Sequence, residues 1–147
     1  MRVRDRLRYA MVLVAVVLPV TGCQVGEPLA CTKVGADSGV GVAYRPADFP
    51  AGARLRLCAD EVCRDLRATE PSAPFGLLDV VLPEAVGEQR TAVRLTVTDP
   101  ASGRAVYDRT AQVTLRKFTP NGPNCEPTVW RAGLRADVRN GLVPTDD

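Results

Sequence analysis

The chain contains no histidine, and this absence excludes several kinds of chemistry. Catalysis by Ser-His-Asp or Cys-His arrangements, imidazole metal ligands and an imidazole pH switch all need that side chain. The 12 glycines are scattered rather than gathered into a phosphate-binding loop. We therefore predict a protein that is not an enzyme and that holds no cofactor and no metal ion. A hydrolase that uses two carboxylates stays open, because acids far apart in the sequence can meet in a fold.

The chain also lacks an apolar run long enough to span a membrane. The run from Tyr9 to Val20 has 12 residues. As a helix it would be about 18 Å long, against roughly 30 Å for the hydrocarbon core of a bilayer. Four arginines precede it, namely Arg2, Arg4, Arg6 and Arg8. A basic start followed by a short apolar run is typical of a secretory signal peptide.

The residues at the end of this run carry a resemblance to a known family. The tetrad Val20-Thr21-Gly22-Cys23 resembles the lipobox of bacterial lipoproteins. The resemblance implies that the Cys23 thiol receives diacylglycerol and that the signal is cut between Gly22 and Cys23. Two acyl chains suffice for stable anchoring, so it also implies a protein held on the extracytoplasmic face of the cell membrane. The alternative is an ordinary signal peptide or anchor with an incidental cysteine.

Lysine is scarce, and the charge balance shifts once the signal is removed. Arginine outnumbers lysine 17 to 2, a bias that resembles the proteins of high-GC actinobacteria. Residues 1–22 hold four of the 19 basic side chains and one of the 17 acidic ones, so the remaining chain has a net charge of −1. No basic stripe is left to favour nucleic acid as a partner.

The predicted organisation has four parts. We expect a signal peptide over residues 1–22, a lipidated tether over 23–30, one domain over 31–143 and a flexible C-terminus over 144–147. A mature chain of 125 residues is of the usual size for one domain with one core.

The cysteine count supports export independently. Five cysteines are present, and assignment of Cys23 to lipid leaves four that permit three disulfide pairings. We favour Cys58 with Cys63, which flank an expected four-residue turn over 59–62, and Cys31 with Cys125, which lie at the two ends of the domain. A four-thiolate zinc site is the competing use of these residues. Their scattered spacing lacks the paired motifs that such sites usually show.

The pattern after Cys31 has a period of two residues, which predicts β-strands. Runs of this kind cover 40–44, 53–57, 91–98 and 106–115, and a short strand is expected over 63–67. Residues 75–82 form an almost unbroken apolar strand with both faces covered or with a hydrophobic edge. Residues 130–138 favour a strand with a candidate bulge at Gly133. A helix over the same residues would also align Trp130, Leu134 and Val138.

Seven or eight strands without a long helix predict an all-β, antiparallel two-sheet sandwich. This architecture resembles immunoglobulin-like and fibronectin-like domains. True immunoglobulin domains place a tryptophan between their paired cysteines, whereas Trp130 follows the last cysteine. The resemblance therefore transfers no site residues to this chain.

The candidate binding face consists of arginines on the predicted hairpin, namely Arg54, Arg56, Arg64 and Arg67. Such a row can bind an anionic polymer of the cell envelope. Its more common role is a solvated outer face whose side-chain stems cover apolar surface. We interpret the acidic residues Asp60, Glu61 and Asp65 as a solvated hairpin tip. For Trp130 and Tyr107, packing is favoured over a binding role.

The leading functional hypothesis is a non-enzymatic, membrane-tethered β-sandwich that binds another envelope component, either a protein or a polymer. One alternative is a carrier of a small apolar or lipid ligand, which would need a cavity of several hundred Å³. The other is the carboxylate hydrolase.

Overall fold

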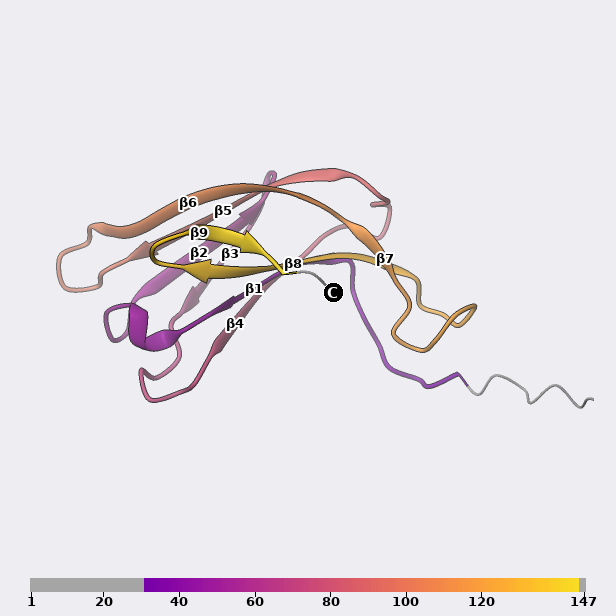
Figure 1. The fold of residues 1–147 in the computed structure, drawn as a ribbon, viewed down its shortest axis with the longest axis horizontal. Coiled ribbons are helices and arrows are strands. Elements are labelled where there is room, and N and C mark those ends of the chain that lie inside the picture. The colour runs from indigo at the N-terminus through magenta and orange to yellow at the C-terminus, as the bar shows by residue number, and fades with distance from the viewer. Residues whose placement is uncertain (1–30, 146–147) are drawn as a thin grey trace, which may run out of the picture.

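Alternating apolar and polar residues build nine strands in residues 31–145, the part of the chain that the computed structural model describes (Figure 1). The predicted signal peptide, the predicted lipidation site at Cys23 and the predicted tether lie outside these described residues. The strands are β1 (Gly39–Tyr44), β2 (Arg54–Ala59), β3 (Val62–Arg67), β4 (Gly76–Val81), β5 (Arg90–Thr98), β6 (Ala105–Thr114), β7 (Arg116–Phe118), β8 (Val129–Asp137) and β9 (Gly141–Pro144). A 3₁₀ turn, η1 (Pro46–Asp48), follows β1.

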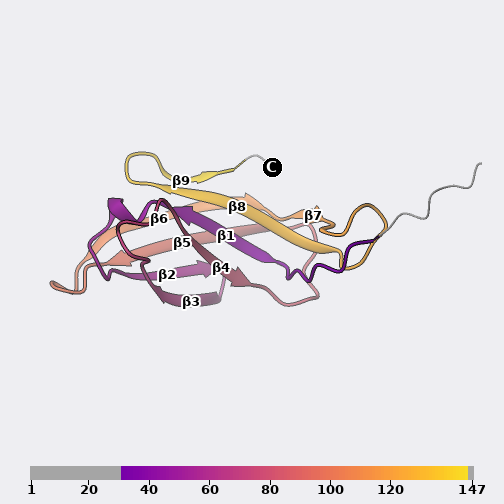
Figure 2. The same cartoon turned by 90° about the horizontal axis from the view of Figure 1, so that it is seen from below.

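The strands form two sheets that pack face to face (Figure 2). One sheet has five strands in the order β4-β1-β8-β7, with β9 also paired to β8, and the other has four in the order β3-β2-β5-β6. Every strand pairing is antiparallel except that between β1 and β8, which is parallel. The predicted two-sheet sandwich is confirmed. The short strands β7 and β9 raise the number of strands above the predicted seven or eight.

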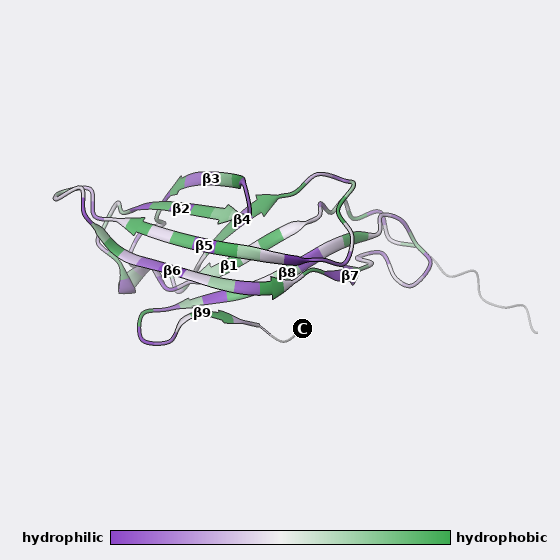
Figure 3. Cartoon of the chain, turned by 90° about the horizontal axis from the view of Figure 1, so that it is seen from above, coloured by the Kyte–Doolittle hydropathy of each residue, from purple (hydrophilic) through white to green (hydrophobic). Residues whose placement is uncertain are grey.

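The core lies between the two sheets and follows the period of two. In β5, Val93, Leu95 and Val97 are fully buried, while the residues between them point outward. Apolar and polar segments accordingly alternate along β5 and β6 (Figure 3). Other inward side chains are Val40, Val42, Tyr44, Leu55, Leu57, Leu78, Val80, Tyr107, Val113, Leu115 and Leu134. Because successive strand residues point to opposite faces, one alternating sequence fills the core and leaves the outer face polar.

The almost unbroken apolar strand is an edge strand. In β4, Leu78 and Val80 are buried between the sheets, whereas Leu77 and Val81 are more than half exposed on the outer face. The free edge of β4 is partly closed by Arg64, whose Nη1 donates to the Asp79 carbonyl at 3.1 Å. The hydrophobic-edge alternative is therefore the correct one for 75–82.

Residues 130–138 adopt the predicted strand rather than the helix. The bulge expected at Gly133 is wrong, because the β1–β8 register runs without interruption through Gly41 and Gly133. The glycine is needed for another reason: a Cβ atom at this position would collide with the hydroxyl of Thr145. The backbone N–H of Thr145 donates to the Gly133 carbonyl at 3.0 Å. The last strand, β9, also includes Pro144, which the sequence assigned to the C-terminal tail.

The predicted disulfides Cys31–Cys125 and Cys58–Cys63 are both present. Cys58 and Cys63 are directly opposed in the β2–β3 ladder. That ladder continues to Ala59 and Val62, so the turn between the strands has two residues rather than the four expected. Asp60 occupies the left-handed region at φ 50°, which aspartate tolerates better than most residues.

The segment after Cys31 is fastened to the loop between β7 and β8. Cys31 is joined to Cys125 in that loop, and Asn121 in the same loop is 6% exposed. The Asn121 side chain accepts from Thr32 Oγ1 and from the Val34 N–H, both at 2.7 Å, and donates to the Val34 carbonyl at 3.0 Å. It also donates to the Glu126 carbonyl. The disulfide and these hydrogen bonds hold the start of the domain in one place.

This fastening defines two ends of the sandwich. The Cys31 end, at the right of Figure 1, contains the loop between β7 and β8 and lies on the side from which β1 starts. The opposite end, here called the distal end, contains the loops 45–53, 68–75 and 99–104 and the turn between β8 and β9. Because β2 runs antiparallel to β5 and β3, Arg54, Arg67 and Thr98 are neighbours at this distal end.

We predict that Asn121→Ala lowers the free energy of unfolding by about 2–3 kcal/mol, because partly buried backbone groups of Val34 and Glu126 lose their partner. The measurement is urea unfolding followed by circular dichroism. Gln112→Ala is the control, since Gln112 is exposed on β6 and makes no side-chain hydrogen bond among the described residues. Equal stability of the two variants would contradict the role given to Asn121.

Candidate binding surfaces

The structure separates the four arginines that the sequence grouped. Arg54 and Arg56 alternate with the buried Leu55 and Leu57 and therefore lie on the outer face of the four-stranded sheet. Arg67 is the register partner of Arg54 and shares that face. Arg64 does not join them, because it is the register partner of Leu57 on the opposite parity and reaches across to β4.

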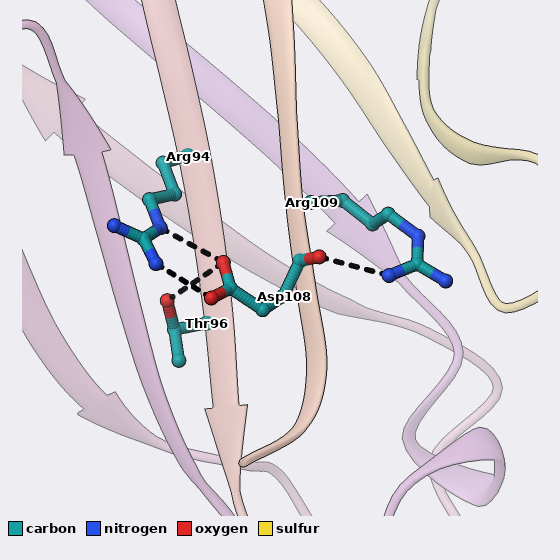
Figure 4. A network of polar contacts seen from close by, with 4 residues as sticks. All are labelled: Arg94, Thr96, Asp108 and Arg109. Carbon is teal, nitrogen blue, oxygen red and sulfur yellow. Dashed lines mark hydrogen bonds and ion pairs between the residues drawn. The ribbon is translucent and has the colours of Figure 1, made fainter.

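Two guanidiniums on this outer face are paired with carboxylates. Arg56 Nη1 lies 2.9 Å from Asp65 Oδ2 on the neighbouring strand. Arg94 on β5 donates to both carboxylate oxygens of Asp108 on β6, at 2.8 and 2.6 Å, and Thr96 adds a third contact at 3.4 Å (Figure 4). The hydrogen bond from Arg94 lowers the pKa of Asp108, and the same pair raises the pKa of Arg94. Both carboxylates thus neutralise the arginine beside them.

Arg54 and Arg67 on the same face have no carboxylate partner of this kind in the described part of the chain. Within residues 31–145 neither guanidinium forms a hydrogen bond or an ion pair. They border a shallow hollow of about 310 Å³ that Asp65 and Leu66 complete. The predicted row of four is therefore reduced to one uncompensated pair at the distal end.

The acidic residues of the hairpin do not form a site. Asp60 Oδ1 accepts from the Ala92 N–H at 2.9 Å, and Asp65 is paired with Arg56. No group of three or more potential metal ligands occurs in the described part of the chain. Asp60 and Glu61 lie in the β2–β3 turn, at the hairpin tip, whereas Asp65 lies within β3 opposite Arg56 and not at the tip.

A groove that the sequence analysis did not predict lies on the outer face of the five-stranded sheet. Its volume is about 400 Å³, and its floor contains Gly41 on β1 and Gly133 on β8. These glycines are register partners, so the sheet lacks side chains on both strands at the same level. Leu77 and Phe118, 58% and 49% exposed, stand on the strands to either side.

An ion pair lies within this mostly apolar groove. Arg131 Nη2 donates to Asp79 Oδ1 at 2.8 Å, and both side chains are about one-third exposed. Asp79 is the register partner of Gly41, and a Cβ atom at Gly41 would come within 3.0 Å of the Asp79 carboxylate. The sequence signal was available, since Gly41 and Gly133 fall on outward positions of their strands. Only the parallel pairing of β1 with β8 places them side by side.

The aromatic residues Tyr107 and Trp130 are used for packing. Tyr107 is 5% exposed and meets Phe49 edge to face, with ring centroids 5.6 Å apart. Burial raises the pKa of its hydroxyl. The Arg109 guanidinium lies 5.5 Å from the ring centroid of Tyr107. Trp130 is partly buried against the core.

Comparisons with known proteins identify no relative of this chain. No family model, no curated protein and no solved structure matches it. Among residues 31–145, no helix is long and apolar enough to cross a membrane.

We predict that Asp108→Asn flattens the acid end of the stability profile. The folded pKa of Asp108 lies below the unfolded value of about 3.9, so its contribution is present above that pH and is lost as the pH falls through the folded pKa. The expected loss in Tm near pH 6 is about 1–4 °C, because the pair is exposed to solvent. Thermal unfolding at several pH values between 6 and 2.5 measures both effects. Glu61→Gln is the control, and an identical pH profile for the two variants would refute the assignment.

Proposed function

We propose that the protein is a lipid-anchored extracytoplasmic lipoprotein whose sandwich domain binds another component of the cell envelope without catalysis. The observation that carries the proposal is the fastening of Cys31 by Cys125, eight residues after the lipobox cysteine, together with the hydrogen bonds from Asn121 to Thr32 and Val34. A short tether that ends at a fixed point suits a domain held close to a membrane. Two disulfides fit an oxidising compartment outside the cytoplasm.

The tether length supports a definite orientation. Eight residues span at most about 26 Å when extended, so the Cys31 end would face the membrane from which the chain emerges. The distal end, with Arg54, Arg67 and the loops 45–53 and 99–104, would then face away from the bilayer. A partner in the envelope would be met at this end or along the outer faces of the sheets.

The non-catalytic part of the proposal is supported by the chemistry available. Without histidine the usual acyl-transfer constellations cannot form. Cys31, Cys58, Cys63 and Cys125 are used in disulfides rather than as nucleophiles. The carboxylates of Asp65, Asp79 and Asp108 are each paired with an arginine. These three carboxylates are therefore held in ion pairs, and a carboxylate hydrolase needs carboxylates that are available to its substrate.

We predict that the protein extracted from membranes begins at Cys23 and carries diacylglycerol, and that Cys23→Ser removes the acyl mass. The variant would leave the membrane fraction or keep its signal. Reduction would add the mass of four hydrogens, one pair for each disulfide. The measurement is intact mass of each cell fraction before and after reduction.

The control is the double variant Cys58→Ser, Cys63→Ser, which should keep the lipid and the location and lose one disulfide. Recovery of the wild-type chain from the cytosol with five reduced thiols and no acyl group would overturn the proposal.

The groove over Gly41 and Gly133 favours a second candidate function, the carriage of a small apolar ligand. Its volume of about 400 Å³ lies within the range of small-molecule sites. Leu77 and Phe118 supply apolar walls, and the Asp79–Arg131 pair supplies the few polar groups that usually orient a ligand. The groove is open to solvent on the outer face of a sheet, which ranks this function second.

For this candidate we predict that a fluorescent fatty acid binds the full-length chain and that Leu77→Asp weakens binding about tenfold, because a charge enters an apolar wall. Fluorescence titration measures the change. Val106→Asp is the matched control, since Val106 is 50% exposed on β6 and does not line the groove. No binding by the wild type, or equal loss in both variants, would reject the carrier function.

A further inference from the structure

We propose that Arg54 and Arg67 form a binding site for the phosphate groups of a phosphodiester polymer in the envelope. This inference rests on the proposed function, because it takes the distal end of the sandwich to face away from the membrane. Of the four arginines that the sequence grouped, the site uses Arg54 and Arg67. It excludes Arg56, which is paired with Asp65, and Arg64, which donates to β4.

The register places the two guanidiniums together. Arg54 on β2 is directly opposite Arg67 on β3, and on its other side Arg54 faces Thr98 on β5. Directly opposed residues in an antiparallel pair have Cβ atoms about 4.5–5.5 Å apart. Both side chains leave the same face of the sheet, so one oxyanion can reach both of them.

The charge at this point is not neutralised by the protein. Asp65, which lines the same hollow, is paired with Arg56 at 2.9 Å. Arg94 has its own partner in Asp108. Within the described residues, the pair therefore holds two positive charges without a bonded carboxylate, on a face where the neighbouring arginines are matched.

Such a pair is unfavourable for the protein alone. Like charges directly opposite one another destabilise a β-ladder, so an anion that bridges Arg54 and Arg67 would relieve the repulsion as it binds. The guanidinium group suits phosphate because its planar array of donors forms two parallel hydrogen bonds to oxyanions. The hollow of about 310 Å³ beside the pair leaves room for such a group.

The position of the pair selects a polymer over the anchoring membrane. Arg54 begins β2 and Arg67 ends β3 at the distal end, whereas the Cys31 end lies beyond the other ends of both strands. Six residues of strand span roughly 17 Å, so lipid phosphates of the anchoring bilayer would lie on the far side of the domain. A phosphate-bearing chain that extends above the membrane can reach the distal end.

The test measures binding of poly(glycerol phosphate) to the purified full-length chain by isothermal titration calorimetry at low and physiological salt. We expect Arg54→Gln and Arg67→Gln each to weaken binding about tenfold, since a charge-assisted hydrogen-bond partner is lost, and the double variant to lose binding. Arg90→Gln is the matched control, because Arg90 lies on the same outer face without an ion pair in residues 31–145, at the Cys31 end. It should bind as the wild type does.

Two further measurements separate site binding from other causes. Removal of one charge of the opposed pair should raise Tm, so loss of binding without loss of stability identifies a ligand site. Vesicles containing phosphatidylglycerol and inorganic phosphate are titrated in parallel, and we expect both to bind more weakly than the polymer.

Three outcomes would overturn the inference: no polymer binding by the wild type, equal weakening by Arg90→Gln, or preferred binding to the vesicles. The assay is carried out in solution and does not depend on acylation. Failure of the proposed anchoring would instead be seen in the intact mass.

Discussion

The parallel pairing of β1 with β8 is the interaction on which the rest of the structure depends. It joins the first strand of the described chain to a strand near its end, so the five-stranded sheet cannot form until both are present. Buried Val42 and Leu134 on these strands then complete one wall of the core. The same pairing brings Gly41 beside Gly133 and opens the groove on the outer face.

The two ends of the sandwich differ in structure, because the start of the domain is fastened at one end only. The disulfide from Cys31 and the hydrogen bonds of Asn121 join the start of the domain to the loop between β7 and β8. A pull from a tether would thus be carried into β7 and β8 rather than into a free strand end. The loops at the distal end take no part in the disulfide or in the hydrogen bonds of Asn121. Arg54 and Arg67, unpaired within the described residues, lie at this distal end, at the start of β2 and the end of β3. Under the proposed function, attachment and recognition would lie at opposite ends of this small domain.

For the arginines of the outer face and for the groove, the sequence pattern predicts the face on which a side chain lies but not its neighbours on other strands. Period two places Arg54 and Arg56 on one face of β2, and it places Arg64 and Arg67 on opposite faces of β3, because strand parity is a local property. Only the register, which sets Arg67 opposite Arg54 and Arg64 opposite Leu57, decides which of these two shares the outer face. Gly133 was interpreted as a bulge for a related reason. Its neighbour Thr145 follows β9, a strand whose pairing with β8 is not visible in the sequence.

The sequence by itself determined the all-β class, the position of most strands, the disulfides favoured at Cys58–Cys63 and Cys31–Cys125, and the lack of imidazole chemistry. Each of these follows from composition or from neighbours a few residues apart, except the long disulfide, which the sequence favoured because Cys31 and Cys125 lie at the two ends of the domain. Tertiary structure alone decided which sheet each strand joins, which arginines meet carboxylates, and where two glycines leave a hollow. Those outcomes depend on contacts between strands distant in sequence, and the sequence pattern records the face of a side chain but not the strand beside it.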